Sequence, residues 1–310
     1  MTLMPSSEAE RRESILVAGA TGYIGGLLIP LLEAQDLNVR CLARSAGTLR
    51  SRVRATTEIV RGDVLDPLSL DQALKGIQTA YYLVHLMAGS KDFEKEDRQA
   101  AANFADAAVK AGVRRIIYMG GLGDENDAGL SPHLRSRHEV GKILRQSGVE
   151  TIEFRASVVI GRGSLSFELV KSLTDRLPVM ICPRWLGTLT QPIAIDDMLA
   201  YLFAARDLPP GESRVFEVGG SDVVPYGDLV REYARQKGLR RWLISVPLLT
   251  PYLSSLWLTL VTPTAFTVAK HLIEGLRNPT VVRDRKALDT FAIRPAGIQK
   301  AVERALAARH

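Results

Sequence analysis

Residues 15–26 read Ile-Leu-Val-Ala-Gly-Ala-Thr-Gly-Tyr-Ile-Gly-Gly, a short apolar run followed by regularly spaced glycines. The run is typical of a buried strand, and Gly19, Gly22 and Gly25 have the spacing of a tight turn that opens a helix. Glycine is needed where the backbone must approach a diphosphate, and the amides at the helix start attract the anion. The stretch therefore predicts a dinucleotide-binding turn rather than a glycine-rich turn without a ligand. The expected contacts come from Gly19, Thr21, Gly22, Tyr23, Ile24 and Gly25.

Short apolar runs alternate with segments of helical period over the first two thirds of the chain. We expect strands at 15–18, 39–42, 57–61, 80–84, 115–119, 151–155 and 215–218. We expect helices at 23–34, 68–74, 92–111 and 136–146. This alternation predicts an α/β fold in which a Rossmann-type, doubly wound parallel sheet is covered by helices on both faces.

The chain divides into three parts by composition. Residues 1–13 are polar and predict a flexible tail that lacks the apolar core of a signal peptide. Residues 14–220 predict the NAD(P)-binding Rossmann domain. Residues 221–310, whose helical segments are joined by irregular connections with prolines, predict a small, mainly helical C-terminal lobe, to which residues 164–190 contribute. We expect this lobe to lie over the carboxyl ends of the strands, where open α/β sheets bind ligands.

Composition and charge exclude several classes of protein. Lys and Arg number 40 and Asp and Glu 34, for a net charge of +6, and 46% of the residues are hydrophobic, which excludes a disordered chain. The basic residues are spread along the chain, so no nucleic-acid partner is expected. The only cysteines, Cys41 and Cys182, exclude a disulfide framework and favour a cytoplasmic protein. The five histidines lack metal-ligand spacing, so no metal site is predicted.

Residues 242–269 contain no charged side chain, which is a long enough stretch to cross a membrane. However, Pro247, Pro251 and Pro263 would break a spanning helix. We expect a buried or groove-lining segment, with a peripheral membrane contact as the alternative. The sequence leaves the oligomeric state open.

The loop after the second predicted strand indicates which cofactor is bound. An NAD site places an acidic side chain there for the ribose, but no Asp or Glu occurs between Asp36 and Glu58. Arg44 lies just past the strand, where its guanidinium can pair with a 2′-phosphate, and Ser45 adds a hydroxyl. A solvated basic loop is the alternative. We therefore expect NADP (NADPH) in preference to NAD.

Two later strand ends supply further cofactor contacts. Asp63 and Val64 follow the third strand and are assigned to the adenine pocket, although Asp63 is equally consistent with a turn or N-cap aspartate. His85 ends the fourth strand and is expected near the nicotinamide.

These motifs resemble the short-chain dehydrogenase/reductase superfamily, and most closely its atypical, NmrA-like members. The resemblance covers about residues 14–235. It is carried by Gly19-Ala-Thr-Gly-Tyr-Ile-Gly25, Arg61-Gly-Asp-Val-Leu-Asp-Pro67, Ile143-Leu-Arg-Gln-Ser-Gly-Val149, Pro192-Ile-Ala-Ile-Asp-Asp197 and Phe216-Glu-Val-Gly-Gly220. It implies either an NAD(P)-dependent reductase or a redox-sensing regulator.

The chain departs from the superfamily's catalytic Tyr-x-x-x-Lys. The Tyr position falls on His133, the Lys position falls on Arg137, and residues 119–123 offer no upstream hydroxyl. His133 is the candidate general acid, with a loop histidine as the alternative. Arg137 cannot lose its proton, so it is either an anchor for the ribose or phosphate or one half of a helix-surface salt bridge. A second register, His138-x-x-x-Lys142, has the same spacing.

The apolar stretches 177–186 and 248–258 are candidates for a substrate pocket. Their anchors Met180, Trp185, Tyr252 and Trp257 either wall such a pocket or form the core of the lobe. The first hypothesis is an NADPH-dependent oxidoreductase that transfers hydride to a carbonyl or activated C=C of a small apolar substrate. The alternative is a non-catalytic NADP(H)-binding redox sensor or assembly protein, with or without a peripheral membrane contact.

Overall fold

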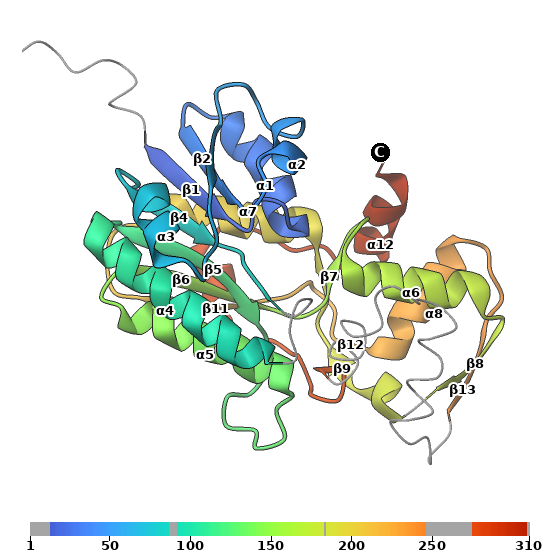
Figure 1. Cartoon of the computed structure of the whole chain (residues 1–310). Coiled ribbons are helices and arrows are strands. Elements are labelled where there is room, and N and C mark those ends of the chain that lie inside the picture. Colours follow the sequence, from blue (N-terminus) through green and yellow to red (C-terminus); the bar gives the residue numbers. More distant parts are fainter. Residues whose placement is uncertain (1–12, 87–91, 183, 246–274, 309–310) are drawn as a thin grey trace, which may run out of the picture.

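A computed structural model describes residues 13–86, 92–182, 184–245 and 275–308. Its centre is a sheet of seven strands in the order β11-β6-β5-β4-β1-β2-β3, and every neighbouring pair is parallel (Figure 1). The strands are β1 (Ser14–Ala18), β2 (Asn38–Ala43), β3 (Glu58–Arg61), β4 (Thr79–Tyr82), β5 (Arg115–Gly121), β6 (Glu150–Ala156) and β11 (Arg214–Val218). Strand order reverses between β1 and β4, so the crevice that binds ligands in such sheets opens there. The predicted Rossmann-type sheet is confirmed.

Helices cover both faces of the sheet, and successive residues of its central strands point to opposite faces. Ile15 and Val17 pack under α1 (Tyr23–Glu33) and α7 (Ile195–Ala204). Leu16 and Ala18 point the other way, toward α3 (Pro67–Leu74), α4 (Phe93–Ala111) and α5 (Pro132–Gln146). The central strands therefore need apolar residues at successive positions, which is why the sequence shows unbroken apolar runs there.

Helix α5 begins four residues before its predicted start at Ser136. The Ser131 hydroxyl accepts a hydrogen bond from the amide of Leu134, 3.3 Å away, and Pro132 occupies the first turn. A serine cap followed by proline is a standard helix start, because both suit the unpaired amides of the first turn. The earlier start places His133 on the first turn of the helix.

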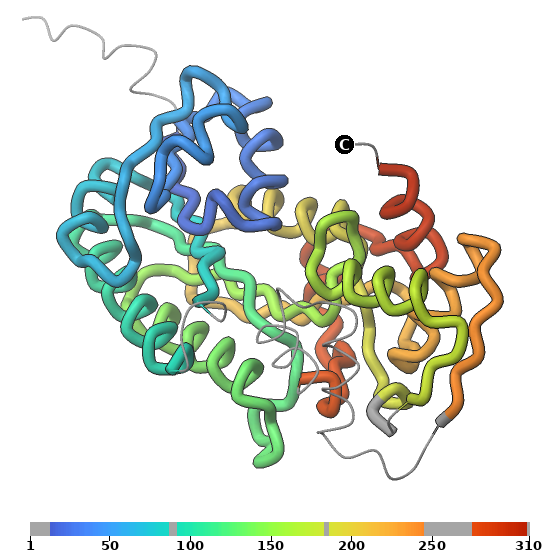
Figure 2. Tube along the Cα trace, turned by 45° about the vertical axis from the view of Figure 1, so that its right-hand side comes forward, coloured from blue at the N-terminus to red at the C-terminus, as the bar shows by residue number. Residues whose placement is uncertain are grey.

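The C-terminal lobe lies beside the sheet domain (Figure 2). It contains α6 (Leu165–Arg176), α8 (Tyr226–Gln236), α12 (Ile298–Ala307) and the parallel pair of β8 (Val179–Cys182) with β13 (Trp242–Ser245). Phe167, Tyr233 and Val302 form its core. The short elements are α2 (Gly47–Arg50), β7 (Val159–Ile160), η2 (Arg184–Gly187), β9 (Leu189–Thr190), β10 (Ile193–Ala194), η3 (Ala205–Asp207), β12 (Val224–Pro225) and α11 (Lys286–Thr290).

The chain returns from the lobe to the sheet domain before α12. Phe291, just after α11, packs its ring 5.1 Å from Phe216 and 5.7 Å from Phe154. Residues after 220 therefore contribute to both cores. Met180 is buried in the lobe core, while Tyr252 and Trp257 lie outside the described residues.

Most of the uncharged stretch 242–269 also lies outside the described residues, which include only β13 of it. Among the helices that the structure describes, none combines the length and the apolar character needed to cross a bilayer.

Candidate functional site

The glycine turn has the shape that a diphosphate requires. Gly19 has φ +91°, and a Cβ built on it would lie 2.5 Å from the carbonyl oxygen of Leu83. A Cβ on Gly25 would lie 2.4 Å from the carbonyl oxygen of Gly19. The amide of Gly22 closes the turn on the same oxygen at 2.9 Å, and Thr21 and Gly22 are exposed. The turn therefore leaves the amides at the start of α1 accessible to an anion, so these residues fit the pyrophosphate of a dinucleotide.

The next two residues of the turn point in different directions. The Tyr23 side chain lies against Gly161 and Gly163, where burial, followed by the charges of Asp196 and Glu168, raises its pKa to about 12. Only the backbone of Tyr23 thus remains at the glycine turn. Ile24 lines a cavity at the carboxyl ends of the central strands.

Arg44 and Ser45 are exposed at the carboxyl end of β2. Other arginines of this region bond to the protein itself: Arg40 to Glu58, Arg50 to the Thr57 carbonyl and Arg54 to the Glu33 carbonyl. Within the described residues, Arg44 has no such partner. Its guanidinium therefore remains available to a ligand phosphate.

Asp63 and Val64 are held by the turn after β3. The Asp63 carboxylate accepts a hydrogen bond from the amide of Leu65 at 3.0 Å, as expected for a turn aspartate. Val64 is buried in the core, and its carbonyl accepts a hydrogen bond from Asn103 at 3.2 Å.

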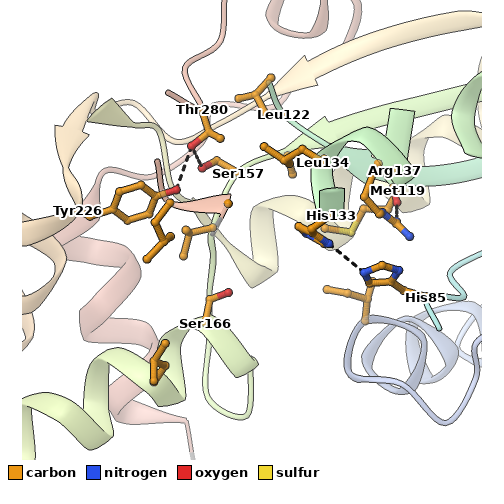
Figure 3. A pocket seen from close by; sticks show the side chains of 18 of the residues that line it. His85, Met119, Leu122, His133, Leu134, Arg137, Ser157, Ser166, Tyr226 and Thr280 are labelled. Carbon is orange, nitrogen blue, oxygen red and sulfur yellow. Dashed lines mark hydrogen bonds between the residues drawn. The ribbon is translucent and has the colours of Figure 1, made fainter. Parts of the chain in front are cut away.

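A cavity of about 310 Å³ opens beyond the carboxyl ends of β4, β5 and β6 (Figure 3). The sheet domain and the lobe both contribute to its wall, which is mainly apolar. Four predicted site residues line it: Ile24, His85, His133 and Arg137. The residues that share this wall with them include Leu83, Met119, Leu122, Leu134, Leu169, Val170, Leu229 and Leu276.

Two histidines and a buried carboxylate form a chain of hydrogen bonds at one end of the cavity. Asp97 Oδ2 lies 3.0 Å from His85 Nδ1, and His85 Nε2 lies 3.1 Å from His133 Nδ1. Asp97 is only 1% exposed and also accepts from the Leu86 amide and the Ser136 hydroxyl, at 3.0 and 2.9 Å. A carboxylate only accepts, so His85 donates to Asp97 through Nδ1.

Asp97 stays ionised although it is buried. Burial alone would raise the pKa of its carboxyl group. The hydrogen bond and charge of His85, together with the Leu86 amide and the charge of Arg137, outweigh burial and lower the pKa below its ordinary value. A buried negative charge therefore lies directly behind His85.

Arg137 is not a helix-surface salt bridge. Its side chain is buried, with 8% of the residue exposed. Its guanidinium donates to the carbonyl of Val84, just past the carboxyl end of β4, at 3.2 Å, and to the carbonyl of Met119 in β5. Its Cζ lies 4.9 Å from the ring centroid of Tyr118. The cation therefore joins two neighbouring strand ends at the cavity wall, one helical turn from His133.

The second register, His138 and Lys142, does not reach the cavity wall. His138 is buried with Nε2 2.9 Å from the carbonyl oxygen of Gly121, and Lys142 is exposed. Burial, followed by the charge of Arg155, lowers the pKa of His138. In the part of the chain that the structure describes, no three His, Cys, Asp or Glu side chains converge as metal ligands would.

Ser157, Tyr226 and Thr280 line the cavity across from the histidines, and their hydroxyl groups meet there with that of Thr190 (Figure 3). The Ser157 Oγ lies 2.6 Å from both Thr190 Oγ1 and Thr280 Oγ1, which are 3.1 Å apart. The Tyr226 hydroxyl lies 3.2 Å from Thr280 Oγ1. We call these four residues the hydroxyl cluster.

The sequence reasoning missed both Asp97 and the hydroxyl cluster. Asp97 had a signal, because it stands one turn before Ala101 on the apolar stripe of α4, where a carboxylate is unexpected. The members of the hydroxyl cluster come from four separate segments and share no spacing.

Comparison with known proteins agrees with this geometry. Residues 19–158 match the family model described as NAD(P)H-binding. The chain is 28% identical over 232 residues to (4-alkanoyl-5-oxo-2,5-dihydrofuran-3-yl)methyl phosphate reductase of Streptomyces griseus, covering 72% of this chain and 74% of that one. An NmrA-like family domain-containing protein of Dictyostelium discoideum is 26% identical over 155 residues, covering 48% of this chain and 50% of its own.

A solved structure has the same fold over almost the whole chain. The triphenylmethane reductase of a Citrobacter species superposes with a TM-score of 0.76, covering 95% of this chain and 100% of that one at 16% identity. Its complex with NADP(H) superposes with a TM-score of 0.74. Reductases are thus found among both the relatives in sequence and the neighbours in fold. Residues 19–158 form an NAD(P)H-binding domain, and the match to an NmrA-like relative and the fold shared with a reductase agree with the resemblance to the atypical, NmrA-like short-chain dehydrogenases/reductases.

Proposed function

We propose that this protein is an NADPH-dependent reductase that transfers hydride to a carbonyl or activated C=C of a small apolar substrate. The observation that carries the proposal is the hydrogen-bonded chain from Asp97 through His85 to His133 on the cavity wall. It supplies a proton source at a site where the superfamily's tyrosine is replaced. A purely sensory protein would have no need of one.

Two groups of residues would bind the phosphates of the cofactor. The amides at the start of α1 would hold the diphosphate, and Arg44 with Ser45 would hold the 2′-phosphate that distinguishes NADPH from NADH. When bound, the dihydronicotinamide supplies the hydride. Ile24, His85 and Arg137 line the cavity in which the substrate would meet it.

His133 would give the proton that completes the reduction. As hydride adds to the carbonyl carbon, the π electrons move to the oxygen, and this oxygen takes the proton from His133 Nε2. His133 keeps its Nδ1 hydrogen on His85 Nε2, while Asp97 balances the positive charge before transfer. The products are the alcohol, the oxidised cofactor and a neutral His133, which then regains a proton from water. For an activated C=C, hydride adds to the β-carbon and the enolate takes the proton.

The wall composition supports an apolar substrate. Leucines and Val170 surround the cavity between its two polar ends, and removing an apolar molecule from water into such a site is favourable in proportion to its area. The cavity of about 310 Å³ suits a small ketone, enone or quinone.

The proposal is tested by NADPH oxidation with a panel of quinones, enones and ketones, comparing wild type with His133→Gln. We expect His133→Gln to lower kcat by about a hundredfold, while the NADPH Kd stays unchanged. His138→Gln is the matched control, since it changes a buried histidine of the same helix that does not line the cavity. Tight NADPH binding with no oxidation across the panel would instead support the redox-sensor alternative. An unchanged kcat in His133→Gln would exclude His133 as the proton donor.

A further inference from the structure

The hydroxyl cluster is a second polar site on the cavity wall, opposite the histidines (Figure 3). Ser157, Tyr226 and Thr280 line the cavity, and Thr190 stands behind them with no exposed surface. Thr280 and Tyr226 are 4% and 7% exposed, so bulk water does not compete strongly for them. Their backbone positions are set separately, because Thr280 pairs with Thr190 in a parallel β-bridge and Tyr226 starts α8.

The hydroxyl groups of this cluster can use all of their hydrogens within it. Each hydroxyl has one hydrogen and two lone pairs, so four hydroxyls can make four internal hydrogen bonds. Four contacts join them, all between 2.6 and 3.2 Å. With each hydroxyl donating once, these contacts use every hydrogen but only half of the lone pairs. Toward the cavity the cluster therefore presents acceptors and no spare donor.

We propose that the hydroxyl cluster recognises a hydrogen-bond donor, a hydroxyl or N–H, on the end of the substrate that lies away from His133. A group that only accepts, such as an ether or second carbonyl, would have to break an internal bond of the cluster to be satisfied. The substrate class is thus an apolar ketone or enone with a donor at its far end. The location of the reducible carbonyl rests on the proposed function, whereas the donor preference of the cluster does not.

Three enones of nearly equal shape test this inference. They are benzylideneacetone, para-hydroxybenzylideneacetone and para-methoxybenzylideneacetone, which carry no polar group, a donor and an acceptor at the far end. We expect the hydroxy compound to bind about tenfold more tightly than the other two, as one buried hydrogen bond allows. Affinity is measured by calorimetry on protein saturated with NADP⁺, and KM is measured separately with NADPH.

Variants of the cluster give opposite expectations. Thr280→Val removes the hydroxyl that contacts the other three. Of the remaining contacts only that between Ser157 and Thr190 persists, so two hydroxyl hydrogens have no acceptor in the cluster. The preference should then turn toward the methoxy compound. Tyr226→Phe removes an acceptor and should reduce the preference for the hydroxy compound about threefold or more, which keeps the test valid if Thr280→Val does not fold. Ser166→Ala is the control, since Ser166 lines the same cavity outside the cluster.

The outcomes separate this inference from the proposed function. Equal affinity for the three enones, or the same order of affinities in Thr280→Val, would overturn the donor site. Variants that weaken NADPH binding but not enone binding would also overturn it, by assigning the cluster to the cofactor. If the hydroxy compound binds selectively but no enone is reduced, the donor site stands and the reductase proposal falls.

Discussion

His85 Nε2 and His133 Nδ1 lie 3.1 Å apart although 48 residues separate them in the chain. His85 follows β4, and His133 belongs to the first turn of α5. Because β4 ends and α5 begins at the same edge of the parallel sheet, the two rings meet at the cavity, and the Asp97 carboxylate lies behind them. Under the proposed function, this pair would deliver the proton that the superfamily's tyrosine supplies elsewhere.

Replacing Asp97 by Asn should weaken this chain of hydrogen bonds and change the acid stability of the protein. The pKa of Asp97 is lower in the folded protein than its ordinary value, so its ionised form contributes stability above about pH 4. That contribution is lost as the pH falls through the lowered pKa. We expect Asp97→Asn to cost about 1–3 kcal/mol at pH 7 and to lose less stability than wild type below pH 4, roughly the ordinary pKa.

Urea unfolding at several pH values measures this difference. Asp106→Asn is the matched control, because Asp106 is exposed on the same helix. If the two variants have the same pH profile of unfolding free energy, the stabilising role of the Asp97 carboxylate is wrong.

Arg44→Ala should reduce the preference for NADPH over NADH. Loss of a charge-assisted contact to the 2′-phosphate is worth about 1.5–3 kcal/mol, so the NADPH Kd should rise about tenfold or more while the NADH Kd changes little. Fluorescence titration with both coenzymes measures this. Arg114→Ala serves as control, since Arg114 is an exposed arginine at the amino-terminal edge of the sheet. Equal effects of Arg44→Ala on both coenzymes would remove the 2′-phosphate assignment.

Neighbouring glycines of α1 should respond in opposite ways to alanine. A Cβ on Gly25 would come within 2.4 Å of the Gly19 carbonyl oxygen, so Gly25→Ala should cost about 1–3 kcal/mol and displace the turn. NADPH affinity should then fall about tenfold or more. A Cβ on Gly26 would find its nearest atom 3.8 Å away, so Gly26→Ala should be neutral or stabilise the helix by up to about 1 kcal/mol. Thermal unfolding with and without NADPH compares them, and similar losses in both variants would contradict the tight-turn argument.

His138→Gln should reduce the loss of stability in mild acid. Burial and the charge of Arg155 hold the pKa of His138 below its ordinary value of about 6.5, so the folded protein resists its protonation. The unfolded chain takes up the proton first, and wild type therefore loses stability as the pH falls below about 6.5. Glutamine can still donate to the Gly121 carbonyl but does not titrate. The unfolding free energy should differ less between about pH 7.5 and 5.5 in the variant than in wild type. An equal difference in both proteins would show that His138 does not cause the loss of stability in mild acid.

The strands and the class of sheet could be predicted because apolar runs and glycine stops are local signals. All seven expected strands form, and the glycine turn opens α1 as expected. The predicted start of α5 is four residues too late because the cap formed by Ser131 and Pro132 gives a weak local signal; His133, the candidate general acid, lines the cavity.

The amino-acid sequence alone determined the parallel sheet, the glycine turn and the candidate basic contact at Arg44, because each depends on residues close together in the chain. Only the tertiary structure decided which side chains meet at the cavity. Asp97 joins His85 and His133, and Ser157 joins Thr280, through contacts between segments far apart in sequence, whose directions are set by the packing of helices on the sheet. The spacing of residues along the chain carries no information about these long-range contacts, because the packing of the helices on the sheet creates them and local conformational preference does not.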